Sequence, residues 1–247
     1  MRLYVFDGGH GDLPDMNHLT PDRNVGKPIT IPVLFFLVDH PQGLVVFDTG
    51  IDNEAGDPFM PDCDPQLRID RQMSRLGYDP ANVRYVILSH LHLDHIGAAY
   101  LFPHATFVVR RSELRGAWWP DSYEGGYNFD ALLKLRGFDY LQPPGDAPFD
   151  VFGDGSLVCI DTKGHTEGHQ SMIVDMPESG KIVLVGDAAQ VLENLTQKVP
   201  PGVCWSSQHA VRSLEKRRHL QAQGALLILG HELSALDSLK LAPYYYE

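Results

Sequence analysis

The sequence predicts an α/β fold in which two sheets pack against each other and helices lie outside. Short apolar runs typical of strands alternate with helical patterns, in the order strands, helix, strand, helix, and the order then repeats. Hydrophobic residues make up 43% of the 247-residue chain and charged residues 21%, which is ordinary for a globular protein. No linker or low-complexity tract interrupts the pattern, so we expect a single domain over residues 1–247.

The first half of the chain contains five expected strands and two expected helices. The strands are "RLYVFDGG", "IPVLFFLVDHPQG", "LVVFDTG", "VRYVILS" and "ATFVVR", and the helices cover residues 66–77 and 111–119. The stretch "DHPQG" has the residues of a hairpin turn. "VRYVILS" is a continuous apolar run, typical of a strand covered on both faces. Residues 120–150, rich in Pro, Gly, Asp and aromatic residues, favour no single assignment.

The second half repeats the same build. Its expected strands are "SLVCIDTKG", "QSMIVDMP", "KIVLVGD" and "ALLILG", with a helix near residues 206–223 before the last of them. Two halves of similar composition each supply a sheet and its covering helices. This repetition is the reason for expecting sheet packed on sheet.

Histidine and aspartate residues follow the ends of four expected strands. They are His90, His92, Asp94 and His95 after "VILS", His165 and His169 after "CIDTKG", Asp187 after "IVLVG", and His231 after "LLILG". Strand ends are where loops converge on a site, and imidazole and carboxylate groups bind zinc and its first-row neighbours. The HxHxDH spacing has chance odds of roughly a few in a thousand, so it predicts a metal site. His165 either binds metal itself or orients His169.

Seven ligands are too many for one tetrahedral ion. They suit two divalent ions about 3.5–4 Å apart, with a carboxylate and a water shared between them. Asp187, which stands alone after its strand, is the expected shared carboxylate. A water between two cations becomes hydroxide near neutral pH and can attack a carbonyl that one ion polarises. The chain has no GxSxG nucleophile motif, which fits hydrolysis without a side-chain nucleophile.

Charge and composition limit the partners. A net charge of −12 argues against nucleic acid, which requires a concentrated basic surface. No apolar run approaches the ~18–20 residues of a membrane span, and the first residues lack the pattern of a signal peptide. Three scattered cysteines favour a reducing compartment, so we expect a cytoplasmic protein without membrane partners. Whether it is a monomer or a homodimer stays open.

The ligand pattern resembles that of the metallo-β-lactamase superfamily. Four further stretches, "IPVLFFLVDHPQGLVVFDTG", "LGYDPANVRYVILSHLHLDHIGAAYLFPHATFVVRRSE", "GHTEGHQSMIV" and "AVRSLEKRRHL", are similar to the N-acyl homoserine lactone lactonases, which degrade quorum-sensing signals. The resemblance spans nearly the whole chain. It implies a four-layer αβ/βα sandwich, in which two mixed sheets pack face to face with helices outside. It also implies two bound ions, zinc first, with iron, cobalt or manganese as alternatives.

The resemblance further assigns roles to the residues of the site. The implied ligands of one ion are His90, His92 and His169, those of the other are Asp94, His95 and His231, and the bridge is Asp187. Asp94 would also handle the proton that must reach the departing ring oxygen.

One position departs from the lactonases, which carry a tyrosine three residues after the bridging aspartate. This chain has Gln190, whose amide donates a hydrogen bond but has no titratable proton. Either Gln190 takes over part of the tyrosine's task, or Tyr123 or Tyr127 does, or the substrate differs. The residues expected to line the substrate mouth, or else to pack within their loops, are Phe59, Met60, Trp118, Trp119, Tyr123 and Tyr127.

The sequence therefore predicts a dinuclear hydrolase that opens lactone rings, most simply those of N-acyl homoserine lactones. Other lactones, catabolic or ring-fused, are the first alternative, and a glyoxalase II-like thioesterase is the second. The thioesterases have a longer helical C-terminal part, whereas sixteen residues follow His231. A redox di-iron protein would place glutamate in the HxH pair. A metal-stabilised protein that only binds lactones is the non-enzymatic alternative.

Overall fold

Two mixed sheets form the centre of the computed structural model, which describes residues 1–52, 64–120 and 126–247. The strand order of the first sheet is β1 (Arg2–Leu13), β2 (Ile29–His40), β3 (Gly43–Phe47), β4 (Val83–Ile87), β5 (Thr106–Val108) and β6 (Asp139–Leu141). The order of the second is β11 (Leu226–Ile228), β10 (Gly180–Leu184), β9 (Gln170–Met176), β8 (Leu157–Asp161) and β7 (Phe149–Asp150). Pairing is antiparallel from β1 to β3 and parallel from β3 to β6, and β10–β11 is the parallel pair of the second sheet.

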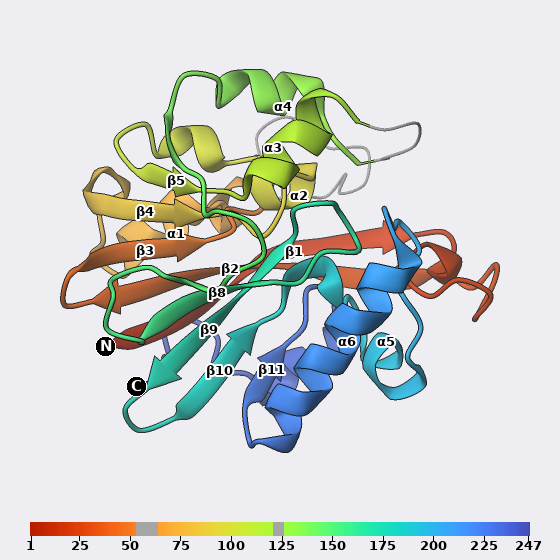
Figure 1. Ribbon diagram of the computed structural model, residues 1–247. Helices are drawn as coiled ribbons and strands as arrows, with labels where there is room; N and C mark the ends of the chain where they lie inside the picture. The colour runs from red at the N-terminus through yellow and green to blue at the C-terminus, as the bar shows by residue number, and fades with distance from the viewer. Residues whose placement is uncertain (53–63, 121–125) are drawn as a thin grey trace.

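Helices cover the outer face of each sheet, as Figure 1 shows. The first sheet carries α1 (Ile69–Arg75), α2 (Leu93–Ile96), α3 (Arg111–Trp118) and α4 (Phe129–Lys134), and the second carries α5 (Leu192–Gln197) and α6 (Ser207–Ala222). The four layers confirm the predicted αβ/βα sandwich. Within the described ranges, no helix combines the length and the apolar character that crossing a bilayer requires.

Successive side chains of a strand in the first sheet enter two different apolar cores, one on each face of the sheet. Leu3 and Val5 of β1 join the core between the sheets, whereas Tyr4 and Phe6 join the core beneath the helices. Successive side chains of a strand point to opposite faces, so a run that is apolar throughout must be covered on both sides. All four side chains are at most 5% exposed. The continuous apolar runs of the sequence are therefore strands between two layers.

Three of the differences from the sequence prediction have local reasons. The helix expected from residue 66 begins only at Ile69, because a 3-10 turn at Pro65–Leu67 and an extended Arg68 precede it. The unassigned stretch 120–150 contains α4, whose first turn is capped by the Asn128 side chain accepting from the Ala131 N–H. The first strand runs on to Leu13, through an irregularity between Asp7 and His10.

Strand direction brings the ligand-bearing loops to one edge. β8 and β10 both run antiparallel to β9, so their C-terminal ends lie on the same side of the second sheet. β11 runs parallel to β10 and ends there too. In the first sheet β3 and β4 are parallel neighbours. The segments that follow these strands carry most of the predicted ligands.

Arg217 is a buried charged residue of α6 that lacks hydrogen-bond partners within the residues that the structure describes. Its side chain is fully buried, and Nε, Nη1 and Nη2 have no hydrogen-bond partner among the described residues. Burial lowers the pKa of Arg217 to about 9, against the opposing effect of the Asp161 carboxylate. A buried guanidinium without partners is destabilising, because its lost hydration is not replaced.

We expect Arg217→Met to raise the free energy of unfolding by about 1–3 kcal/mol, the usual penalty for buried polar groups left without partners. Urea unfolding of both proteins measures the change. The matched control is Arg218→Met on the exposed neighbour, which should stay within about 0.5 kcal/mol of the parent. A less stable Arg217→Met protein would contradict the expectation.

Candidate metal centre

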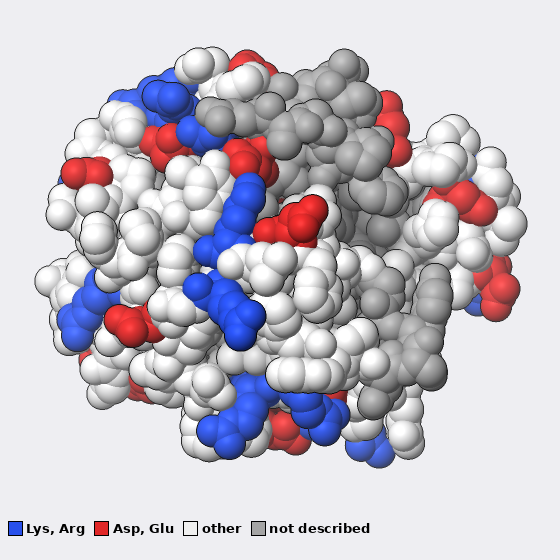
Figure 2. All heavy atoms as spheres, turned by 90° about the horizontal axis from the view of Figure 1, so that it is seen from above, with Lys and Arg blue, Asp and Glu red and all other residues white. Residues whose placement is uncertain are grey.

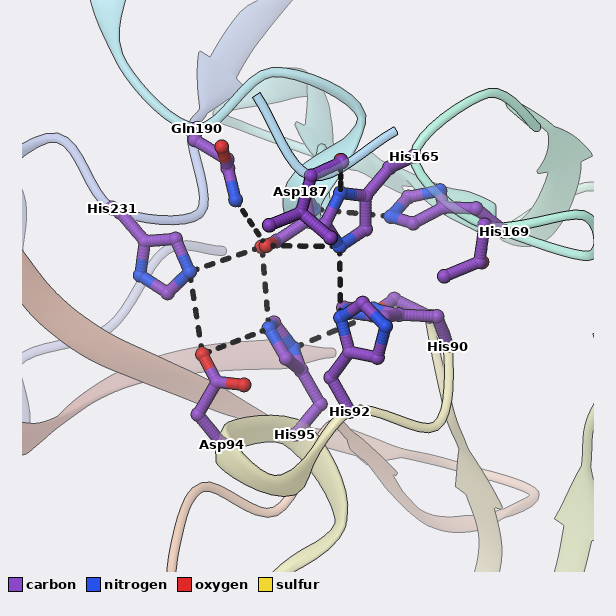
Figure 3. A network of polar contacts seen from close by, with 12 residues as sticks. His90, His92, Asp94, His95, His165, His169, Asp187, Gln190 and His231 are labelled. Carbon is purple, nitrogen blue, oxygen red and sulfur yellow. Dashed lines mark hydrogen bonds and ion pairs between the residues drawn. The ribbon is translucent and has the colours of Figure 1, made fainter. Parts of the chain in front are cut away.

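The predicted ligands come together at the shared edge of the sheets, as Figure 3 shows. The segment after β4 carries His90 and His92, and His92 is the extended N-cap residue of α2. Asp94 and His95 then lie in the single turn of α2. The HxHxDH spacing is therefore an extended segment followed by a helical turn, which directs several ligands toward one point.

Two imidazoles and two carboxylates form a closed set on one side of the site. The Nε2 atoms of His95 and His231 each lie 3.2 Å from Oδ1 of Asp187. The same two nitrogens lie 3.5 Å and 3.4 Å from Oδ2 of Asp94. The three residues Asp94, His95 and His231 have ligand atoms near enough to hold a cation. They are the three residues predicted to hold the second ion.

The charges in this set favour ionised partners. Burial would lower the pKa of His231, but the carboxylates of Asp187 and Asp94 raise it to about 9. His95 likewise has its pKa raised well above the usual value. Burial would raise the pKa of Asp187, but His231 and His95 hold it well below its usual range. Without metal, two protonated imidazoles therefore compensate the carboxylates.

The other side of the site is made of neutral imidazoles. His90, His92 and His165 form a second group that could hold a cation, and His90, His95 and Asp187 form a third. Burial, followed by the neighbouring His165, lowers the pKa of His92 to about 3, and burial also places that of His90 well below its usual value. The Nε2 atoms of His90 and His92 have no hydrogen-bond partner among the described residues. Such nitrogens have lone pairs available to a metal.

His165 and His169 are placed differently from the expectation that one orients the other. Nδ1 of His169 is 2.9 Å from the Thr162 hydroxyl, and its Nε2 accepts from the Asp187 N–H at 3.0 Å. His165 instead has Nε2 within 3.0 Å of Nδ1 of His92, and its Nδ1 donates to the carbonyl of Val203 at 2.6 Å. His169 therefore lies beside the metal-binding groups, and His165 lies within one of them.

The sequence reasoning missed the groups that bind Nδ1 of His90, His95 and His231. Nδ1 of His95 lies 2.8 Å from Asp48, Nδ1 of His90 lies 2.9 Å from the Ser89 hydroxyl, and Nδ1 of His231 donates to the carbonyl of Pro32 at 2.8 Å. Partners of this kind set the tautomer and orientation of a ligating ring. Asp48 follows "LVVF", so the rule that drew attention to other strand ends would also have found it.

Gln190 contacts the predicted bridging carboxylate. Its Nε2 donates to Oδ2 of Asp187 at 2.6 Å, whereas His95 and His231 lie beside Oδ1. Figure 3 shows the Gln190 amide turned toward Asp187. The side chain is buried, and its Oε1 has no hydrogen-bond partner in the described part of the chain. Gln190 thus stabilises the negative charge of Asp187.

The predicted substrate-mouth residues are only partly described. Phe59, Met60 and Tyr123 lie outside the described residues. Tyr127 packs with its ring centroid 4.9 Å from that of His92, directly beside the site. Trp118 packs edge-on against Phe129, and Trp119 is 77% exposed. Of the described candidates, Tyr127 is the one in contact with a predicted ligand.

The donor set fits divalent cations. It is buried, it offers imidazole nitrogens without partners, and it includes an aspartate between the rings of His95 and His231. Nitrogen and carboxylate donors of this kind suit zinc and neighbouring metals. Each of three overlapping groups has ligand atoms close enough to hold an ion.

Comparison with known proteins identifies the family. A model described as the metallo-beta-lactamase superfamily matches residues 30–231. The chain belongs to the metallo-β-lactamase superfamily. This confirms the resemblance read from the HxHxDH, GHTEGH, Asp187 and His231 pattern.

Within the superfamily the chain is similar to lactonases. It is 38% identical to the N-acyl homoserine lactonase AttM of Azorhizobium caulinodans, over 100% of this chain and 99% of the relative. It is 27% identical to the N-acyl homoserine lactonase AiiA of Bacillus thuringiensis subsp. kurstaki, over 99% and 98%. A crystal structure of a quorum-quenching N-acyl homoserine lactone lactonase superposes with a TM-score of 0.86 at 26% identity, covering 99% of this chain and 97% of that one.

We expect metal binding to release protons. His231, with its pKa raised to about 9, stabilises the metal-free fold fully below its unfolded value of about 6.5, and this contribution is lost as pH rises through about 9. Metal must displace that proton, so affinity for zinc should increase with pH across the same window. Calorimetric titration at pH 7.5 in buffers of different ionisation enthalpy measures the release.

The control for this titration is His231→Asn, which should release fewer protons than the parent protein. Equal observed heats in all buffers, for the parent protein, would contradict the expected protonation of His95 and His231.

Proposed function

We propose that the chain is a metal-dependent hydrolase that opens the ring of N-acyl homoserine lactones. The observation that carries the proposal is Asp187, buried between the Nε2 atoms of His95 and His231 at 3.2 Å from each. The similarity to AttM over the full length of both chains supports this substrate class. Lactone opening adds water across the ring ester, so the product keeps both its new carboxylate and its new hydroxyl.

The proposed ligands are those the sequence predicts: His90, His92 and His169 for one ion, Asp94, His95 and His231 for the other, and Asp187 between them. Two divalent ions, zinc first, would supply Lewis acidity toward the ester carbonyl and lower the pKa of an attacking water. Both carboxylate oxygens of Asp187 have partners: Oδ1 faces His95 and His231, and Oδ2 accepts from Gln190 and lies 3.4 Å from Nε2 of His165.

Asp94 is the proposed proton carrier. Its Oδ2 faces His95 and His231, whereas its other oxygen has no marked contact in Figure 3. Its side chain is 33% exposed, compared with 4% for Asp187, so it can reach substrate. Burial would raise the pKa of Asp94, but the two imidazoles bring it below its usual range, so the carboxylate is ionised. In the proposed reaction it takes up the proton that the attacking water releases. It then delivers that proton to the ring oxygen as the C–O bond breaks.

A different lactone is the second candidate substrate, and Gln190 is the observation that favours it. In the structure its amide is bound to Asp187 at 2.6 Å, so its role differs from that of a phenol held free for the lactone. Tyr127, with its hydroxyl donating to Glu113, lies over His92 and could contact the substrate by its ring. An apolar acyl chain or a fused ring would suit the aromatic side chains proposed for the mouth.

We also propose that the protein is cytoplasmic and binds neither nucleic acid nor membrane. We propose that it is a monomer or a homodimer. Burial raises the pKa of Cys159 to about 12 and that of Cys204 to about 11, and both thiols are free, which suits a reducing compartment. On the face seen in Figure 2, basic and acidic side chains lie interspersed among neutral ones.

A hydrolysis panel on metal-loaded protein tests the function. It includes homoserine lactones of several acyl lengths, plain γ- and δ-lactones, a thioester and a β-lactam, with proton release as the readout. We expect the highest kcat/KM with an acyl homoserine lactone. Preference for a plain lactone would support the second candidate, and activity confined to the thioester would refute both.

Asp94→Asn is expected to fold and bind at least part of the metal, yet to lose about 10²–10⁴-fold in kcat, the usual contribution of a positioned acid–base group. Metal content and lactone turnover are measured on the same preparation. Asp175→Asn, on the exposed side of β9, is the matched control. Parental turnover by Asp94→Asn protein would exclude the proton-carrying role.

A further inference from the structure

The carboxylate of Glu113, on α3, lies behind the metal centre and accepts four hydrogen bonds. Its Oε1 accepts from the Leu91 N–H at 2.9 Å and from the Tyr127 hydroxyl at 3.1 Å. Its Oε2 accepts from the Thr166 hydroxyl at 2.6 Å and from the Gly168 N–H at 3.0 Å. The residue is 1% exposed. A buried carboxylate is tolerated only with such a set of donors, so its presence has a reason beyond packing.

The two oxygens serve two different ligand loops. Leu91 stands between His90 and His92, and Gly168 directly precedes His169. Each loop therefore has a backbone N–H next to a predicted ligand that is bound to one oxygen of the same carboxylate. The separation of the loops is set by the rigid geometry of a single carboxyl group.

Close packing around Glu113 leaves little freedom for these loops. A Cβ atom at Gly168 would lie 2.1 Å from the backbone nitrogen of Glu113, so a glycine is needed for this approach to α3. A Cβ atom at Gly126 would lie 2.8 Å from the ring of His92. The neighbouring Tyr127 covers that ring while its hydroxyl is held by Glu113. Glu113 thus fixes both the loops and the cover of His92.

We propose that Glu113 is a positioning residue that holds the two histidine-bearing loops in register, and so sets the affinity and geometry of the metal centre. The proposal rests on the two-metal function proposed above. Glu113 touches neither substrate nor metal and acts through Leu91, Gly168 and Tyr127. Outer groups that fix metal ligands typically contribute about 10–100-fold to metal affinity.

Glu113→Gln is the sharpest test, because an amide has one acceptor and one donor end. If its NH₂ faces Leu91, it opposes the Leu91 N–H. If the NH₂ faces Gly168, it opposes the Gly168 N–H. In either orientation one loop loses its bond, although the shape of the side chain hardly changes.

The matched control is Glu167→Gln. Glu167 lies in the same loop as Thr166 and Gly168, but its carboxylate pairs with Arg115 on the outer side. Both variants replace a carboxylate by an amide close to the segments that carry the predicted ligands. Of the two residues, only Glu113 bonds to both histidine-bearing loops, so only the Glu113 variant should disturb the contact between them.

Three measurements are made on each full-length protein. Hydrogen exchange of the Leu91 and Gly168 amides in metal-free protein reports the bonds directly. The visible spectrum of Co²⁺-loaded protein reports ligand geometry, and competition with a chelator reports Zn²⁺ affinity. We expect Glu113→Gln to lose protection at one of the two amides, to change the Co²⁺ spectrum and to weaken Zn²⁺ binding about 10–100-fold. Glu167→Gln should match the parent protein in all three.

Parental amide protection together with a parental Co²⁺ spectrum in Glu113→Gln would overturn the proposal. If that variant fails to fold, Thr166→Val decides instead, since it removes one of the four bonds and should lower protection at Gly168 while sparing Leu91. If the parent protein binds no metal, the two-metal function is wrong, and amide exchange alone then decides whether Glu113 joins the loops.

Discussion

The site depends on one buried carboxylate, that of Asp187, which two imidazoles share at 3.2 Å each. A carboxylate with a 4% exposed side chain is stable only if positive charge surrounds it. His95 and His231 come from different sheets, so this requirement fixes where β4 and β11 must end. Glycine makes the approach possible, because a Cβ atom at Gly230 would lie 2.7 Å from Oδ1 of Asp187. A glycine is thus required sterically in the "LGH" that follows β11.

The same carboxylate divides the site into two electrostatic halves. On one side His95 and His231 have raised pKa values because Asp94 and Asp187 face them. On the other side His92 has its pKa lowered to about 3, by burial and by the imidazole of His165. Metal entering the first half must displace protons, whereas metal entering the second finds lone pairs already free. The two halves should therefore differ in how their affinity responds to pH.

Sequence reasoning found the groups that a local pattern carries and missed the groups that act across the chain. The ligand-bearing strand ends followed from apolar runs ending in His or Asp, and the sandwich followed from the repeated order of strands and helices. Asp48 follows a strand end and was overlooked although the same rule applied to it, whereas Glu113 was not found because its bonds to Leu91 and Gly168 span more than twenty residues of sequence. Nothing in the helical pattern of α3 indicates that its glutamate is turned inward.

Gln190 contacts the predicted ligand Asp187 at the position where the resemblance to lactonases implied a tyrosine. Its amide is already bound to Asp187 through Nε2, and this donor reduces the negative charge that Asp187 presents to a cation. If Asp187 holds two cations as proposed, a carboxylate of lower basicity would leave them more electron-poor, and hence stronger Lewis acids toward an ester carbonyl. An amide at this position can thus assist the reaction without touching the lactone. Selection of the substrate then falls to side chains on the other loops, of which Tyr127 over His92 is the described example.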